Sequence, residues 1–167
     1  EIKSIKPFPP KKVRPCVFEY IYFARPDSII NNKTAYEHRK NLGKELAKEC
    51  KINADVVVPV PDSGNAAALG FAQHLSMNFE LGLIRNHYVG RTFIEPSQKI
   101  RSLGVKLKLN PNKSSIKDKK IILIDDSLVR GTTSHKIVKM LYDSGAKEVH
   151  VKIACPEIKY PDFYGVD

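Results

Sequence analysis

The chain has 167 residues, 42% of them hydrophobic and 28% charged, which is the composition of an ordinary globular domain large enough to bury a core. Its three cysteines are widely spaced, which argues against a disulfide framework and favours a cytoplasmic location. No apolar run approaches the ~20 residues of a membrane span, so we expect no membrane association.

The net charge of +10 is concentrated in two segments. Residues 99–120 hold eight basic residues and one acid, and residues 1–14 hold five basic residues and one acid. Such a balance can indicate a nucleic-acid surface, but no aromatic residues interleave with the 99–120 cluster and no DNA-binding motif is visible. A local cluster of this kind suits a polyphosphate better, and we expect no nucleic-acid partner.

Apolar spacing and turn residues predict the elements in chain order. Residues 1–14 predict a linker or extended arm, followed by one domain over 15–167. Strands are predicted over 17–24, 55–60, 79–84, 121–124 and 148–154, and helices over 34–50, 64–75 and 134–144. Thr34 and Glu37 predict a capping box, and residues 88–110 lack periodicity and predict a long excursion. Strands that alternate with helices predict an α/β fold with a mostly parallel sheet flanked by helices.

The strand at Ile121–Ile124 is followed by two carboxylates, Asp125 and Asp126, and then by a loop of small and hydroxyl-bearing residues that leads into a helix. The amides of such a helix N-terminus suit a phosphate. Adjacent carboxylates would repel that phosphate unless a cation or hydrogen-bond donor lay between. Ribose hydroxyls with Mg²⁺ close by would meet this need. The alternative is that Asp125 and Asp126 merely cap the helix.

A second strand, loop and helix follow the same plan over 56–65. The hydroxyl of Ser63, the loop amides and Gly64, which lets an anion approach closely, would suit a pyrophosphate. The alternative is again that Asp62 and Ser63 simply cap the following helix.

The run IILIDDSLVRGTT at 121–133 resembles the phosphoribosyl pyrophosphate (PRPP) signature of type I phosphoribosyltransferases. Further segments resemble the phosphoribosyltransferase domain of the amidophosphoribosyltransferase family: EYIYFARPDS at 19–28, VPVPDSG at 58–64, RNHYVGRTFI at 85–94, PEIKYP at 156–161 and YGVD at 164–167. The likeness runs from about Pro15 to the last residue, with the order and spacing of every segment kept.

The resemblance implies the type I phosphoribosyltransferase fold with a flexible catalytic loop. It also implies transfer of a phosphoribosyl group from PRPP to ammonia, which gives 5-phosphoribosylamine and pyrophosphate at the first committed step of purine synthesis. The family takes its ammonia from glutamine in an upstream glutaminase domain, so we expect this chain to be a piece of a longer protein. Purine nucleotides are expected as feedback inhibitors, and the intact protein as a homo-oligomer. A nucleobase phosphoribosyltransferase and a non-catalytic PRPP-sensing regulator remain alternatives.

The resemblance also implies the residues of the site. PRPP is expected at Asp125, Asp126, Ser127, Val129, Arg130, Gly131, Thr132, Thr133, Asp62, Ser63 and Gly64. Mg²⁺ is expected at Ser63, Asp125 and Asp126, and catalytic roles are expected for Tyr88, Arg91 and Lys108. These last three belong to a lid whose cations would stabilise the departing pyrophosphate. An iron–sulfur cluster, which some family members carry, is not expected because Asp162 occupies one of its cysteine positions.

Overall fold

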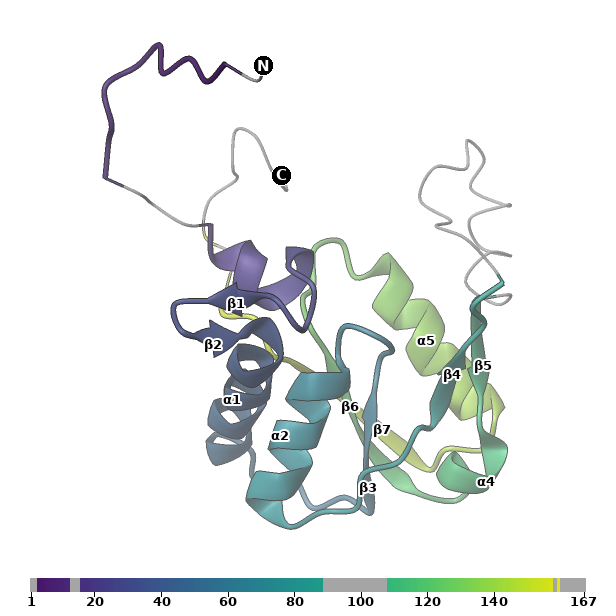
Figure 1. The fold of residues 1–167 in the computed structure, drawn as a ribbon. Helices are drawn as coiled ribbons and strands as arrows, with labels where there is room; N and C mark the ends of the chain where they lie inside the picture. Colours follow the sequence, from purple (N-terminus) through teal and green to yellow (C-terminus); the bar gives the residue numbers. More distant parts are fainter. Residues whose placement is uncertain (1–2, 13–15, 89–107, 158, 160–167) are drawn as a thin grey trace.

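The computed structural model describes residues 3–12, 16–88, 108–157 and 159. Its centre is a parallel sheet with the strand order β3–β6–β7, formed by β3 (Val56–Pro59), β6 (Lys120–Asp125) and β7 (Glu148–Ile153). The long helices are α1 (Ala35–Lys48), α2 (Asn65–Leu75) and α5 (Thr132–Asp143). Figure 1 shows α1 and α2 together on one side of the sheet and α5 on the other.

The central strand β6 explains this layering. Ile121 and Leu123 belong to the core that α5 covers, whereas Ile122 and Ile124 belong to the core that α1 and α2 cover. Successive side chains of a strand point to opposite faces, so a strand buried on both sides reads as an unbroken aliphatic run. The predicted α/β fold with helices on both faces of a parallel sheet is therefore confirmed.

Helices α1 and α2 pack with their backbones in close contact. A Cβ added to Gly43 would lie 2.6 Å from the carbonyl carbon of Ala67, and one added to Gly70 would lie 2.8 Å from the carbonyl carbon of Lys40. Each helix therefore has a glycine at the point where it contacts the backbone of the other helix. The predicted capping box is confirmed at the start of α1, because the Thr34 side chain accepts from the Glu37 N–H at 3.1 Å while the Glu37 carboxylate accepts from the Thr34 N–H at 2.9 Å.

The strand predicted over 17–24 is wrong. This segment contains a π-helical turn, η1 (Glu19–Phe23), closed by the Ala24 N–H donating to the Glu19 carbonyl at 3.2 Å. Only Ile21 is buried, at 2% exposure, while Tyr22 and Phe23 lie at the surface. The alternating aromatic pattern therefore reflects a turn with one inward side chain, not a strand with one buried face.

The strand predicted over 79–84 is only half right. Phe79 makes a single parallel bridge to Val57, and the regular strand β4 (Leu83–Arg85) pairs antiparallel with β5 (Leu109–Pro111). The predicted excursion over 88–110 is consequently wrong at its end, where β5 begins. No sequence pattern indicated the hairpin of β1 (Ile29–Ile30) and β2 (Lys33–Thr34), or the short helix α4 (Lys113–Ile116).

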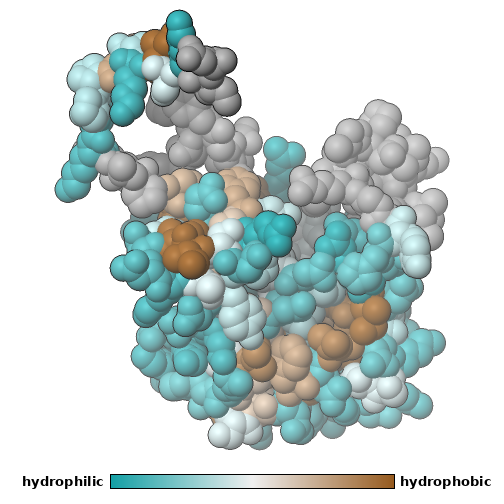
Figure 2. Space-filling view, in the orientation of Figure 1, coloured by the Kyte–Doolittle hydropathy of each residue, from teal (hydrophilic) through white to brown (hydrophobic). Residues whose placement is uncertain are grey.

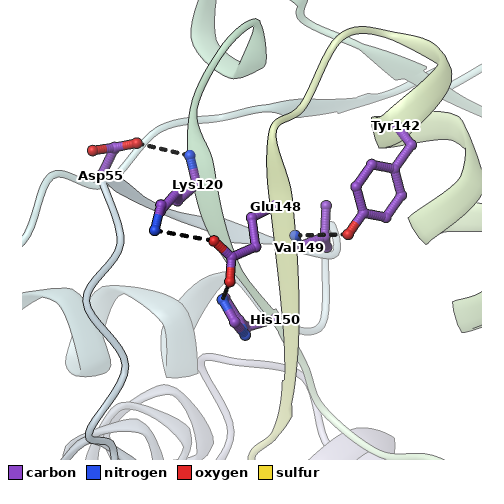
Figure 3. Close-up of polar contacts among 6 residues, drawn as sticks. All are labelled: Asp55, Lys120, Tyr142, Glu148, Val149 and His150. Atoms are coloured by element: carbon purple, nitrogen blue, oxygen red, sulfur yellow. Dashed lines mark hydrogen bonds and ion pairs between the residues drawn. The ribbon is translucent and has the colours of Figure 1, made fainter.

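A polar network joins the amino ends of the central strands (Figure 3). The Asp55 carboxylate accepts from the Lys120 N–H at 2.7 Å, and the Lys120 ammonium pairs with Glu148 at 3.2 Å. His150 contacts the same carboxylate at 2.8 Å, and the Tyr142 hydroxyl accepts a backbone N–H of β7 at 3.2 Å. This network fixes the strand starts, at the end of the sheet opposite the predicted site.

The surface is largely polar. Figure 2 shows hydrophilic residues over most of the visible face, with apolar side chains in separate spots. In the part of the chain that the structure describes, no helix combines the length and the apolar character needed to span a membrane.

Candidate functional site

The two predicted phosphate loops lie at the same edge of the sheet. Strands β3 and β6 are parallel neighbours in the register Val56↔Ile121 to Pro59↔Ile124, so their carboxyl ends are adjacent. The loop after β3 leads directly into α2, and the loop after β6 leads directly into α5. In α/β proteins, ligands bind in the crevice outside such carboxyl ends.

Neither helix that follows these loops has a side-chain cap. Gly64 is the N-cap of α2 and Gly131 is the N-cap of α5, and no side-chain hydrogen bond caps either one. The alternative in which Asp62, Ser63, Asp125 or Asp126 serve simply as caps is therefore wrong. Uncapped first-turn amides need an acceptor from outside the helix, and an anion suits both this need and the helix dipole.

The two N-cap glycines have different reasons to be glycine. Gly131 has φ +69°, the left-handed region that side chains rarely adopt, although a Cβ there would have room, with Leu128 Cδ1 as its nearest neighbour at 3.9 Å. A Cβ at Gly64 would instead lie 2.6 Å from the Ile124 carbonyl oxygen and 2.8 Å from the Val60 carbonyl oxygen. Gly64 is thus required by the packing of its loop against the strand ends.

The adjacent carboxylates have distinct surroundings. Asp126 is only 7% exposed, and the Ser127 hydroxyl donates to its Oδ1. The Asp125 Oδ1 accepts from the Asp126 N–H at 2.9 Å. Burial, together with the charge of Asp126, raises the pKa of Asp125 to about 7. Holding both carboxylates ionised is therefore costly, and a bound cation or hydrogen-bond donors would reduce that cost.

Two cavities lie beside the loop after β3, and Asp126 lines one of them. The inner one, of about 10 Å³, is lined by Ile21, Arg39, Leu42, Ser63, Ala67, Asp126 and Ala154. The outer one, of about 300 Å³, is lined by Pro26, Tyr36, Arg39, Asp62, Ser63, Asn65 and Ala66. Ser63 and Arg39 line both. The predicted ribose carboxylate and the predicted pyrophosphate loop are thus brought together around a shared space.

The residues present fit a magnesium ion that is completed by a ligand. Among the described residues, no group of three or more His, Cys, Asp or Glu side chains could hold a metal by itself. Magnesium, however, commonly takes one or two carboxylates and fills its remaining positions with water and substrate oxygens. Asp125, Asp126 and the Ser63 hydroxyl are hard oxygen donors of this type, and a cation would relieve the cost reflected in the raised pKa of Asp125.

Two of the three predicted lid residues, Tyr88 and Lys108, lie at one end of the antiparallel pair β4–β5, where both contact Asn86. The Asn86 N–H donates to the Lys108 carbonyl at 2.8 Å, and the Tyr88 N–H donates to the Asn86 side chain at 3.0 Å. The Tyr88 side chain is fully exposed. Arg91, like the rest of 89–107, lies outside the described residues, and so does Asp162.

The other predicted residues of the loop after β6, at 127–133, lie at the surface or near it. Val129, Arg130, Thr132 and Thr133 are exposed, and Ser127 and Gly131 are half-buried. Asp27, whose role no sequence pattern decided, forms an exposed ion pair with Arg25 at 3.0 Å, and this hydrogen bond lowers the pKa of Asp27.

Sequence reasoning missed two arginines. Arg85, at the end of β4, pairs with Asp62, and its buried Nε has no hydrogen-bond partner among the residues that the structure describes. Arg39 is 6% exposed and lines both cavities. A signal for Arg39 exists, because it interrupts the buried stripe that Ala35, Gly43 and Ala47 form along α1. A charged residue within a stripe of small side chains indicates a special partner.

Comparisons with known proteins agree with this geometry. A family model described as the phosphoribosyl transferase domain matches residues 27–159. The chain is 58% identical to the amidophosphoribosyltransferase of Rhizobium etli over 166 residues, which cover 99% of this chain and 34% of that protein. It is 56% identical to the amidophosphoribosyltransferase of Methanocaldococcus jannaschii over 152 residues, which cover 91% of this chain and 32% of that protein.

A solved structure shows the same likeness. Glutamine PRPP amidotransferase from B. subtilis, complexed with ADP and GMP, matches with a TM-score of 0.80 and 54% identity, over 90% of this chain and 33% of that chain. The chain spans about a third of the length of these relatives. Because the family model covers most of the sequence, the chain belongs to the phosphoribosyl transferase domain family.

Proposed function

We propose that this phosphoribosyl transferase domain transfers the phosphoribosyl group of PRPP to ammonia and releases pyrophosphate. The product is 5-phosphoribosylamine, and the reaction is the first committed step of purine biosynthesis. The similarity to amidophosphoribosyltransferases supports the choice of acceptor, as does the match, at 54% identity, to a structure described as the allosteric regulatory enzyme of purine biosynthesis. The observation that carries the proposal is that both uncapped helices follow the adjacent carboxyl ends of β3 and β6, where Ser63 and Asp126 line one cavity.

In this proposal each of the two loops binds a different part of PRPP. The loop at 127–133 binds the 5′-phosphate through the first-turn amides of α5 and the hydroxyls around them. The loop at 61–64 binds the pyrophosphate at the N-terminus of α2. Asp125 and Asp126 accept hydrogen bonds from the ribose hydroxyls, which places the sugar between the two anion sites.

The transfer itself exchanges one bond at C1 of the ribose. The C1–O bond to pyrophosphate breaks and its electron pair leaves with the pyrophosphate, while the nitrogen of ammonia forms the C1–N bond and gives up one proton to solvent. Tyr88, Arg91 and Lys108 contact the departing group, and the cations among them stabilise its developing charge. Ser63, Asp125 and Asp126 would hold Mg²⁺, which would supply positive charge to neutralise the pyrophosphate.

The longer protein would complete this activity. A glutaminase domain would supply ammonia from glutamine, and purine nucleotides would compete with PRPP because they share its ribose phosphate. The B. subtilis enzyme similar to this chain was solved with ADP and GMP. We also propose that the intact protein is a cytoplasmic homo-oligomer.

The test is pyrophosphate release from PRPP, Mg²⁺ and ammonium, without any nucleobase. The variant Asp125→Asn/Asp126→Asn should lose at least about 100-fold in turnover, because the ribose and the metal lose their ligands. Asp143→Asn is the matched control, because Asp143 is exposed at the far end of α5, where it pairs with Lys139. Circular dichroism should show that all variants fold.

Each other outcome would contradict the proposal. Full turnover in the double variant would show that the two carboxylates do not have the assigned role. Release that requires an added nucleobase would identify a nucleobase phosphoribosyltransferase, and PRPP binding without release would identify a sensor.

A further inference from the structure

Arg39 is a buried cation to which the proposed reaction assigns no part. It projects from α1 and is 6% exposed. Its Nε donates to the Tyr20 carbonyl at 2.9 Å, and its Nη2 donates to the Ala24 carbonyl at 2.7 Å. Both acceptors belong to the η1 turn, Ala24 as its C-cap, so one guanidinium holds the turn in place at two points.

The same side chain shares the inner cavity with Asp126. Arg39 and Asp126 both line this space of about 10 Å³, and the two charges attract each other without forming a direct ion pair. Burial lowers the pKa of Arg39, and the charge of Asp126 opposes that shift. A carboxylate that is only 7% exposed is costly unless positive charge or donors surround it. Arg39 supplies that positive charge.

The two hydrogen bonds that hold Arg39 leave the oxygens of Asp126 available to a ligand. A free arginine beside a carboxylate tends to form a bidentate pair, which occupies both carboxylate oxygens. Here two backbone carbonyls hold the guanidinium, so it can stabilise Asp126 through space while leaving carboxylate lone pairs available. Asp126 accepts a hydrogen bond from Ser127 and retains capacity for further donors.

We propose that Arg39 is a positioning residue for PRPP: it anchors the η1 turn beside the inner cavity and supplies the positive charge that keeps Asp126 ready to accept the ribose hydroxyls. This inference rests on the proposed function, because Asp126 has this role only if the site binds PRPP. Arg39 also lines the outer cavity together with Asp62 and Ser63, so its charge also acts on residues of the proposed pyrophosphate loop.

The test compares four substitutions in this chain. Arg39→Met and Arg39→Gln remove the charge, and Gln keeps a side-chain donor for one carbonyl in case the Met variant does not fold. Arg39→Lys keeps the charge but cannot reproduce the two-pronged donation of a guanidinium. Lys48→Met is the matched control, because it removes a cation from an exposed position of the same helix. Calorimetric titration with PRPP in the presence of Mg²⁺, thermal unfolding, and pyrophosphate release are measured for each.

We expect the neutral variants to bind PRPP at least about tenfold more weakly, and Arg39→Lys to recover most of that loss. The Mg²⁺ concentration that gives half-maximal PRPP binding should not rise in the neutral variants, because removing a cation makes the site more negative. General damage to the site would weaken the response to both ligands. Lys48→Met should match the wild type in every measurement.

Two results would overturn the inference. One is a folded neutral variant that binds PRPP as the wild type does, and the other is an Arg39→Lys variant as weak as the neutral ones, because charge would then play no part. Absence of pyrophosphate release by a wild-type chain that binds PRPP would refute the proposed transfer reaction instead, and the binding comparison would still decide the role of Arg39.

Discussion

The substitution Gly43→Ala tests whether the contact between α1 and α2 is as close as the structure shows. At an exposed position in the middle of a helix, this change is stabilising by roughly 0.5–1 kcal/mol because glycine loses more backbone entropy on folding. Here the new Cβ would lie 2.6 Å from the carbonyl carbon of Ala67, with the oxygen nearer still, whereas ordinary contacts begin at 3.4 Å. The helices must therefore move apart by at least 0.8 Å, the difference between these two distances.

Such overpacking typically costs about 1–3 kcal/mol, and a backbone carbonyl cannot swing aside as a flexible side chain can. We take the upper part of that range, subtract the gain in helix propensity, and expect a net loss of about 2 kcal/mol. For a chain of this size the unfolding temperature should then fall by roughly 4–8 °C, which thermal denaturation followed by circular dichroism would measure. Asn41→Ala is the control, because Asn41 is exposed on the same helix and should gain stability slightly. A Gly43→Ala variant as stable as the wild type would refute the close approach of the two helices.

Two further predictions concern titrating groups. The pKa of Asp125 is raised from 3.8 to about 7, so between these values the folded chain retains a proton that the unfolded chain has lost, and stability falls as the pH rises across this window. Without Mg²⁺, Asp125→Asn should therefore raise the unfolding temperature at about pH 8 and lose that advantage toward about pH 4; a difference independent of pH would contradict the assignment. Thr34→Ala removes the acceptor of the Glu37 N–H and should cost about 1 kcal/mol, or roughly 2–4 °C. The Thr34 hydrogen bonds lower the pKa of Glu37, so the stabilisation that the Glu37 carboxylate gives the wild type is lost as the pH falls through that lowered pKa. Equal unfolding temperatures for the wild type and Thr34→Ala near neutral pH would refute the cap.

Local patterns were sufficient wherever the physical cause is local. The run Ile121–Ile124 predicted a strand covered on both faces, because a doubly buried strand can be aliphatic at every position. Thr34 and Glu37 predicted the start of α1, because their hydrogen bonds span only three residues. The positions of the two strand-to-helix loops were predicted for the same reason, since a strand end, small residues and a helix start are consecutive in sequence.

Patterns failed where a distant residue decides the structure. The sequence of the η1 turn has the alternating pattern of a strand. The turn forms because Arg39, from another element, donates hydrogen bonds to the carbonyls of Tyr20 and Ala24. Strand β4 pairs with β5, which follows it at a separation of more than twenty residues, so nothing near Leu83 indicates its partner. The pair of Asp62 with Arg85 is likewise invisible in sequence, because the two residues lie on different elements.

The position of Arg39 depends on the packing of α1 against α2. Arg39 and Gly43 are one helical turn apart on the same buried stripe of α1, so the contact that requires glycine also sets the depth at which the guanidinium enters the site. If α1 moved outward on α2, it would carry Arg39 away from Asp126 as well as from the η1 turn. We therefore expect Gly43→Ala to weaken PRPP binding although Gly43 lines neither cavity, and Asn41→Ala to leave binding unchanged. A destabilised Gly43→Ala variant with normal PRPP affinity would separate helix packing from the site and contradict this connection.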